Sequence, residues 1–468
     1  MTSQDIFSLF PLIFLSGTAV LVMLSIALRR SHIGVAFLSA FGLSLAFLST
    51  FFYQEPNFLM LLRIDSFSIM VMQGLLITSL IAIFFTYEYM KNKSEEPEEF
   101  YILLLLSTLG SLVLVASNNF VSLFLGLELL TIPLYCAISY NCEDRKSIEA
   151  GVKYIILAGL AAAMMLFGIA LIYAASGTMN FTLLRPNDQT SLFLGGVALV
   201  FAGLAFKISL VPFHVWTPDV YDGAPLPAAT FLATISKGAS LVVLLRLYLL
   251  LKPYAEPELF WLLTIIAILS MLMGNLLALR QENIKRLVAY SSIAHFGYLT
   301  MAVIAAGELA VQALLLYLLA YIITILIIFG VLTLLEGPHE KVADLRGLFR
   351  SEPFLAVAFM LGLLSLMGLP LTALFMAKFL VIMVAIKNSL WPLIISLIIS
   401  SAIGIFVYLR VAQVLFGTRE YQDYSKRFKP MASAVVAILA LGLLTLGVWP
   451  TPATEHIRYQ DAQSHLAK

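Results

Sequence analysis

Long apolar runs, each about as long as a lipid bilayer is thick, dominate this sequence. A helix needs ~20 residues to cross the ~30 Å hydrocarbon layer. Charged residues make up only 12% of the 468 residues, about half of what a soluble domain carries, so a large buried core does not explain the runs. The pattern predicts an all-α polytopic membrane protein of about fourteen transmembrane helices, with approximate limits 6–28, 32–53, 64–87, 100–116, 118–140, 149–175, 191–212, 226–251, 258–279, 284–306, 309–336, 354–384, 388–418 and 430–449.

No low-complexity tract or soluble domain interrupts the chain, and we predict a single membrane domain over 1–468. We divide it into three N-terminal helices (1–99), a first repeat (100–251), a second repeat (258–418) and a last helix (430–449). The first apolar run is long enough to span the bilayer and lacks a preceding basic region, so we do not expect a cleaved signal peptide.

Basic residues in the loops predict the orientation, because Lys and Arg are enriched on the inner side of a membrane. If the N-terminus lies outside, sixteen of the 28 basic residues fall in inner loops and six in outer loops or the C-terminal tail. We therefore expect both termini on the outer side. The outer residues are Arg63, Arg185, Lys252, Lys387, Arg458 and Lys468. The inner residues are Arg29, Arg30, Lys91, Lys93, Arg145, Lys146, Arg280, Lys285, Arg286, Lys341, Arg346, Arg350, Arg419, Lys426, Arg427 and Lys429.

The remaining six basic residues lie inside the predicted spans, where a cation costs at least ~2.5 kcal/mol at the bilayer centre. Arg246 and Arg410 lie near span ends, which favours side chains that reach out to the lipid headgroups. Lys153 lies one turn into its span and could do the same. It also follows Glu149 by four residues, so the two can pair on one helix face. The sequence leaves both interpretations of that pair open.

Three lysines, Lys207, Lys237 and Lys378, lie too deep to reach the headgroups, and Glu128 lies near the middle of its span. Burial disfavours the charged form of both residue types, and an opposite charge restores it. Groups whose proton affinity can be moved in this way are what a proton relay needs. The alternative is a set of inert ion pairs that hold helices together.

Two histidines extend this set. His214 follows Lys207 by seven residues, which would put both on one helix face. His295 lies near the middle of the tenth predicted span, among hydroxyl side chains. A single histidine in a span is often a hydrogen-bonded packing residue, but the neighbouring buried lysines favour a role in proton transfer.

Two predicted spans carry helix breakers, Pro212 in the seventh and Pro370, after Gly368, in the twelfth. Spans seven and twelve are five apart, so spans 4–8 and 9–13 could form inverted repeats. Interrupted helices at matching positions of two such halves indicate the ion site of a transporter. The alternative is a pair of unrelated proline kinks.

The sequence shows no motif for a metal or a nucleotide. His214 and Asp219 lack a third ligand at useful spacing. There is no phosphate-binding or dinucleotide-binding glycine pattern, and no iron–sulfur or haem motif. We therefore expect no redox cofactor, metal or nucleotide in this chain, and no nucleic acid as a partner.

Three sequence runs resemble the antiporter-like subunits of respiratory complex I, the proton-pumping NADH:quinone oxidoreductase. They are GLAFKISLVPFHVWTPDVYDGAPLPAATFLATISK, ENIKRLVAYSSIAHFGYL and LSLMGLPLTALFMAKF. The resemblance covers nearly the whole chain and is closest to the subunit N type. Lysine at position 378 argues against subunit M, which has glutamate there. The short tail after the last span argues against subunit L, which continues into a lateral helix.

The resemblance implies roles for individual residues. Glu128 would modulate Lys207, Lys237 and His295 would link two half-channels, and Lys378 would control the half-channel toward the outside. The inner acid and lysine of the family would correspond to Glu149 and Lys153.

The resemblance also implies that the chain translocates protons in a bacterial inner membrane as a subunit of NADH:quinone oxidoreductase. NADH, FMN, iron–sulfur clusters and quinone would then be bound by partner subunits. Two alternatives are a subunit of a Mrp-type sodium/proton antiporter and a scaffold subunit that conducts nothing.

Overall fold

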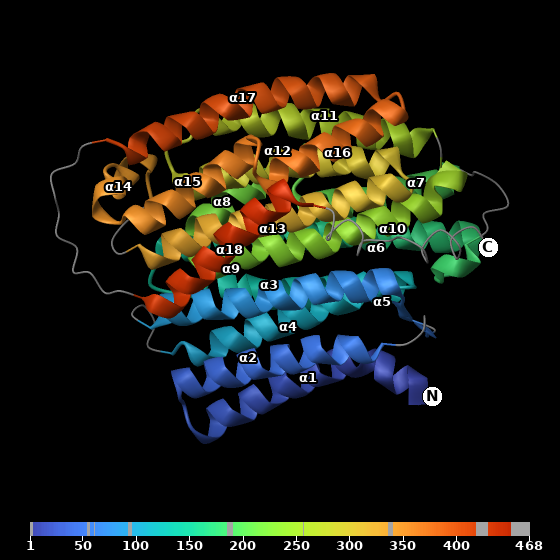
Figure 1. Cartoon of the computed structure of the whole chain (residues 1–468). Coiled ribbons are helices and arrows are strands. Elements are labelled where there is room, and N and C mark those ends of the chain that lie inside the picture. The colour runs from blue at the N-terminus through green and yellow to red at the C-terminus, as the bar shows by residue number, and fades with distance from the viewer. Residues whose placement is uncertain are drawn as a thin grey trace. The chain divides into compact units, whose positions relative to one another are not determined.

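The computed structural model describes residues 3–53, 57–59, 61–91, 96–184, 191–255, 257–335, 340–417 and 429–450. It is almost entirely helical (Figure 1). The chain forms two compact units, which we describe separately. Unit 1 comprises 1–208, 223–262 and 459–468, and unit 2 comprises 209–222 and 263–458. The C-terminal tail after 450 lies outside the described residues, as do Lys93, Arg185, Arg419, Lys426 and Arg427, which entered the prediction of orientation.

Unit 1 holds the first seven long helices and the segment after the first break. Its helices are α1 (Ser3–Leu28), α2 (His32–Ser49), α3 (Ser66–Met90), α4 (Glu98–Val115), α5 (Phe120–Ile138), α6 (Arg145–Ser176), α7 (Ser191–Ile208), α9 (Leu226–Phe231), the π-helical turn η3 (Leu232–Ser236) and α10 (Lys237–Ala255). Short 3₁₀ turns lie at η1 (Thr50–Phe52) and η2 (Phe181–Leu183). Helix α10 packs on α4 and α7, and α5 packs on α4 and α6.

Unit 2 holds nearly all of the short helix α8 (Trp216–Gly223) and most of α11 (Glu258–Ala278). It continues with α12 (Ile284–Ala305), α13 (Glu308–Leu334), η4 (Val342–Leu345), α14 (Leu348–Ser351), α15 (Pro353–Met367), α16 (Ala373–Lys387), α17 (Trp391–Leu415) and α18 (Pro430–Val448). Helix α13 contacts α12, α15, α16 and α18, so it lies at the centre of this unit.

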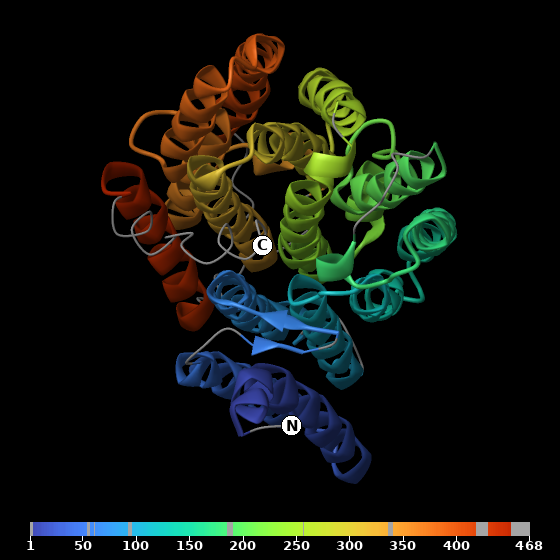
Figure 2. The ribbon, with the colours of Figure 1, turned by 90° about the vertical axis from the view of Figure 1, so that its right-hand side faces the viewer.

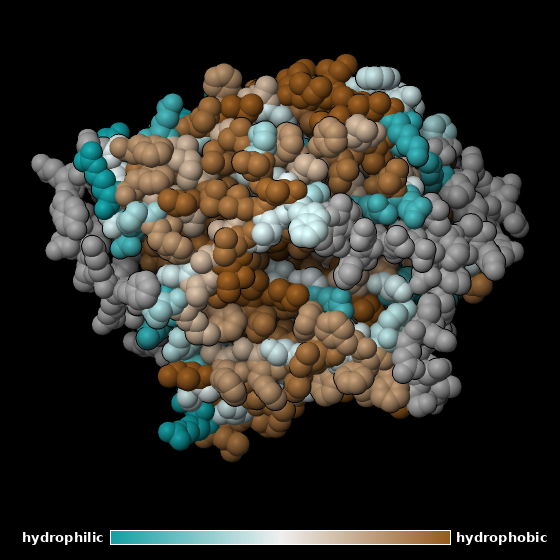
Figure 3. Space-filling model, viewed as in Figure 1, coloured by the Kyte–Doolittle hydropathy of each residue, from teal (hydrophilic) through white to brown (hydrophobic). Residues whose placement is uncertain are grey.

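The helices confirm the predicted membrane fold. Thirteen described helical segments are long and apolar enough to cross a bilayer. The remaining predicted span, 354–384, is the pair α15 and α16, separated by a break. Hydrophobic side chains cover the helix flanks in view and hydrophilic ones gather near the helix ends (Figure 3). Such extensive exposed apolar surface fits contact with lipid.

Both predicted helix breaks are present. Helix α7 ends at Ile208, four residues before Pro212, and helix structure resumes at Trp216. Helix α15 ends at Met367, and α16 begins at Ala373, so Pro370 lies inside the second break. The broken segments are the fourth of the five in each predicted repeat. The inverted relation between spans 4–8 and 9–13 stays a prediction.

A short β-hairpin precedes helix α3 in unit 1. Strands β1 (Asn57–Phe58) and β2 (Arg63–Ile64) pair antiparallel, as the paired arrows in Figure 2 show. The Arg63 amide donates to the Ala116 carbonyl (2.7 Å), just beyond the end of α4. Asp65 follows the hairpin and caps the N-terminus of α3, where it accepts from the Ser68 amide (2.8 Å).

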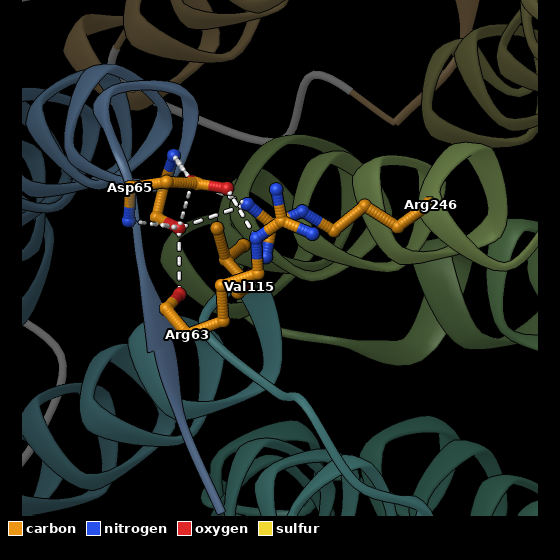
Figure 4. A network of polar contacts seen from close by, with 5 residues as sticks. Arg63, Asp65, Val115 and Arg246 are labelled. Atoms are coloured by element: carbon orange, nitrogen blue, oxygen red, sulfur yellow. Dashed lines mark hydrogen bonds and ion pairs between the residues drawn. The ribbon is translucent and has the colours of Figure 1, made fainter. Parts of the chain in front are cut away.

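Arg246 binds this cap instead of reaching out to the headgroups, so the sequence prediction for this residue was wrong. From α10 its guanidinium reaches the Asp65 carboxylate (2.6 Å) and donates to the Val115 carbonyl (2.8 Å), as Figure 4 shows. Arg63 pairs with the other carboxylate oxygen (2.8 Å). Asp65 lies 181 residues before Arg246, so sequence spacing does not identify it as the partner of this arginine.

The charge of Asp65 is fixed by these contacts. Burial alone raises the pKa of the carboxyl, but Arg246 and Arg63, together with the hydrogen bonds from Ser68, hold the pKa below its usual range. Asp65 therefore stays ionised near neutral pH. Arg246 thus connects the middle of α10 to the start of α3 and the end of α4.

Arg410 makes a weaker set of contacts. It is exposed near the end of α17 and donates to the carbonyls of Leu279 and Gln281 (both 2.6 Å), beyond the end of α11. These carbonyls can bind water if the arginine is removed, whereas Asp65 cannot.

Replacing Arg246 with alanine should destabilise the protein by about 3 kcal/mol, because the buried Asp65 loses one of its two cationic partners. Thermal unfolding of the purified protein in detergent would measure this loss. Arg410→Ala is the matched control and should cost about 1 kcal/mol or less. Equal shifts in Tm for the two variants would contradict the structural role assigned to Arg246.

Candidate functional site

Lys207 lies in the last turn of α7, with 2% of its surface exposed. Its ammonium donates to the hydroxyl of Thr131 on α5 and to that of Tyr154 on α6 (2.9 Å). The Thr131 hydroxyl donates in turn to the Leu127 carbonyl (2.5 Å), which leaves its lone pairs for the lysine. The position at a helix C-terminus also favours a cation.

Glu128 lies on α5 three residues before Thr131, and therefore on the same side of that helix. It is half-buried, and among the described residues its Oε1 atom has no hydrogen-bond partner. The charges of Glu128 and Lys207 interact, but within the described part of the chain the two form no direct ion pair. Glu128 and Lys207 therefore interact through their charges and not through a direct bond.

Lys237 begins α10 directly after the π-helical turn η3 and is fully buried. The preceding residues Thr234 and Ser236 are buried as well, as is Ser240 one turn later. A π-helical turn in a helix often marks a functional position. The sequence reasoning found the lysine but gave no sign of this turn.

Glu149 and Lys153 form the predicted i,i+4 ion pair on α6, with the ammonium 2.8 Å from the carboxylate. Both side chains are partly exposed, 59% for Glu149 and 42% for Lys153. Of the two interpretations that the sequence left open, the structure shows the ion pair.

The prediction for His214 was wrong. Helix α7 ends at Ile208, so Lys207 and His214 are not two turns apart on one helix face. His214 lies in the break between α7 and α8 and is half-buried. Ser209, the first residue after α7, has a positive φ of 66°. Its hydroxyl accepts a hydrogen bond from the Thr217 hydroxyl (2.6 Å).

Lys378, on the helix that follows the second break, binds the carbonyls at the end of the helix that precedes it. Gly368 has a φ of 81°, and its amide and that of Leu369 bond back to the carbonyls of Ser365 (2.8 Å) and Leu364 (3.1 Å). The last two carbonyls of α15, those of Leu366 and Met367, accept from the Lys378 ammonium at 3.1 and 3.2 Å. A Cβ at position 368 would lie 3.1 Å from that ammonium, so glycine also leaves it room.

His295 lies near the middle of α12 and is buried. Its Nδ1 shares a hydrogen bond with the Tyr317 hydroxyl (2.8 Å). The charge of Lys378 acts on the imidazole, and the Leu366 carbonyl that binds Lys378 also interacts with the ring. His295 and Lys378 are therefore brought together in unit 2.

The structure thus forms two clusters from the predicted residues: Glu128 with Lys207 in unit 1, and His295 with Lys378 in unit 2. Sequence reasoning missed the hydroxyl groups of Thr131 and Tyr154, which bind the Lys207 ammonium. Thr131 stands three residues after Glu128 and Tyr154 next to Lys153, so helical spacing gave a signal for Thr131 but none for Tyr154. In the described part of the chain, no three His, Cys, Asp or Glu side chains come together as metal ligands.

The family described as NADH:quinone oxidoreductase/Mrp antiporter, TM, matches residues 117–404, which include both clusters. The chain belongs to this family. Among its relatives, the NADH-quinone oxidoreductase subunit N of Ectopseudomonas mendocina is 44% identical over 97% of this chain and 96% of that protein.

Solved structures agree with this membership. A chain of respiratory complex I from Thermus thermophilus is 32% identical, with a TM-score of 0.85 over 95% of this chain and 98% of that chain. A chain of the Mrp complex from Dietzia sp. has a TM-score of 0.86 over 100% of this chain and 99% of that chain. At 18% identity, this second likeness shows a shared fold only.

Replacing Thr131 with valine should destabilise the protein by about 2 kcal/mol, because the buried ammonium of Lys207 loses one of its two hydrogen-bond acceptors. Thr131→Ser keeps the hydroxyl and should cost less than about 1 kcal/mol. Thermal unfolding in detergent would compare the two. A valine variant no less stable than the serine variant would show that the hydroxyl acceptor does not stabilise the protein at this position.

Proposed function

We propose that this chain is an antiporter-like subunit, of the subunit N type, in a bacterial NADH:quinone oxidoreductase, and that it translocates protons through its buried lysines. The 44% identity to a subunit N over nearly the whole chain supports the assignment. The observation that carries the mechanism is Lys207, which is buried and held by hydroxyl groups.

In the proposed path a proton is loaded at Lys207, passes through Lys237 and His295, and is released under the control of Lys378. The step between Lys237 and His295 follows from the family resemblance. Glu149 and Lys153 would support loading on the inner side. The hydrogen bonds at Lys207 and at Lys378 are the geometric support for the two ends of the path.

The contacts at Lys207 suit a group that gains and loses a proton. Hydroxyl oxygens stabilise the ammonium as acceptors, and the same hydroxyl groups can donate to a neutral amine. An ionised Glu128 favours the charged lysine, and that support is lost when Glu128 takes up a proton or turns away. Glu128 therefore biases the protonation of Lys207 without a bond that would have to be broken.

We assign electron transfer to other subunits. NADH, FMN, iron–sulfur clusters and quinone would be bound there, and the energy of quinone reduction would reach this chain through its membrane partners. The chain lies in the bacterial inner membrane as a multi-pass protein. The distribution of basic residues supports the placement of both termini on the outer side.

Lys207→Ala should abolish proton pumping, because alanine cannot take up the proton that Lys207 carries in the proposed path. The measurement is proton uptake together with NADH:quinone turnover in inverted membrane vesicles, with assembly of the complex verified. Lys387→Ala is the control, since Lys387 is exposed at the end of α16.

The alternatives predict different results. A scaffold subunit would lose assembly, but not protons pumped per electron, when Lys207 is replaced. A Mrp-type antiporter subunit would drive sodium-dependent proton movement without NADH. Normal pumping at normal turnover in the assembled Lys207→Ala complex would refute the proposal.

A further inference from the structure

We propose that the face of the Tyr298 ring stabilises the ammonium of Lys378, and that Asn275 and Ser400 are positioning residues that hold this ring in place. The inference rests on the proposed function, in which Lys378 carries a proton. It assigns to three residues of unit 2 a role that none of the sequence motifs indicated.

The ring of Tyr298 lies beside both proton-carrying groups. The Lys378 ammonium is 5.3 Å from the ring centroid, within the range of a cation–π interaction. The imidazole of His295 meets the same ring edge-on, with the ring centroids 5.5 Å apart and an interplanar angle of 76°. Tyr298 is buried, so water does not weaken its attraction for the ammonium.

The hydroxyl group of Tyr298 is occupied elsewhere. It accepts from the Asn275 side-chain amide (2.9 Å) and bonds to the Ser400 hydroxyl (2.8 Å). The Ser400 hydroxyl donates to the Met271 carbonyl (2.5 Å). Because that carbonyl can only accept, the Ser400 hydroxyl is an acceptor toward its other neighbours, and the Tyr298 hydroxyl donates to it. The Asn275 nitrogen also lies 2.8 Å from the Ser400 hydroxyl.

The orientation of the Asn275 amide is determined by the same contacts. Its nitrogen is also 2.9 Å from the backbone carbonyl of Ser400, which must be met by a donor. The Tyr298 hydroxyl therefore donates its proton to Ser400 and lies within reach of the Asn275 amide as an acceptor. Its proton is thus bound to Ser400 and is not part of a relay to Lys378.

The backbone brings these groups together. A Cβ at Gly274 would lie 2.6 Å from the Ala294 amide nitrogen, and one at Gly297 would lie 2.8 Å from that of Met271. Helices α11 and α12 thus approach through glycines adjacent to Asn275 and Tyr298. Asn275 and Ser400 are both buried, and they connect α11, α12 and α17 around the tyrosine.

This arrangement separates two roles for an aromatic residue beside a proton carrier. A relay would need the hydroxyl and would fail in phenylalanine. A ring that stabilises the charged ammonium needs only the electron-rich face, which phenylalanine keeps. Lys378 is then stabilised by carbonyl dipoles on one side and by the ring on another.

The test measures protons pumped per NADH in inverted vesicles with the assembled complex. Tyr298→Leu should lower the ratio, because the ammonium of Lys378 loses the ring that stabilises its charged form, and Tyr298→Phe should restore most of the lost pumping. Asn275→Leu should lower the ratio in the native background and add little in the Tyr298→Phe background, where its bond to the hydroxyl is already absent. Tyr173→Leu, at an exposed tyrosine of α6, is the control.

Phenylalanines with increasing fluorination at position 298 keep the ring shape and weaken its electrostatic face. Pumping should fall stepwise with each fluorine. A Tyr298→Phe variant as impaired as Tyr298→Leu, or a flat fluorination series, would overturn the inference. Lys378→Ala distinguishes a failure of the proposed proton path from a failure of the proposed role of the ring. Normal pumping in that variant refutes the path itself. Lost pumping in that variant, together with a flat fluorination series, refutes only the role of the ring.

Discussion

A lysine ammonium buried among apolar helices needs oxygen acceptors around it, and this requirement organises both clusters of the protein. Lys207 meets it with hydroxyl groups from two neighbouring helices. Lys378 meets it with the two carbonyls that the broken helix α15 leaves unpaired. In the second case the break and the buried charge satisfy each other, so neither would be stable alone in lipid.

The buried charges differ in how they are held. Arg246 and Asp65 form a direct ion pair that connects α10 to the start of α3 and the end of α4. Lys207 and Lys378 have no carboxylate within ion-pair distance in the described part of the chain, and uncharged oxygens hold them instead. A proton can leave a group held in this way without stranding an opposite charge. The permanent pair therefore fits a structural role, and the two lysines fit proton transfer.

Much of this fold could be predicted from the sequence, because apolar length and proline position act locally. The fourteen segments and the breaks near Pro212 and Pro370 follow from the chain itself. Side-chain partners far apart in sequence do not. The ion pair of Arg246 with Asp65 and the bond of Lys207 to Tyr154 depend on which helices pack together, and His214 was misplaced because α7 ends earlier than the proline.

The central claim is that the buried lysines carry the protons and do more than cap helix ends. Lys378→Gln tests it most directly, because the glutamine amide can still donate to the carbonyls of Leu366 and Met367 but cannot take up a proton. The measurement is the number of protons pumped per NADH in vesicles that contain the assembled complex. The account predicts normal assembly with pumping lost. Normal pumping in this variant would show that Lys378 only closes the broken helix, and would contradict the account.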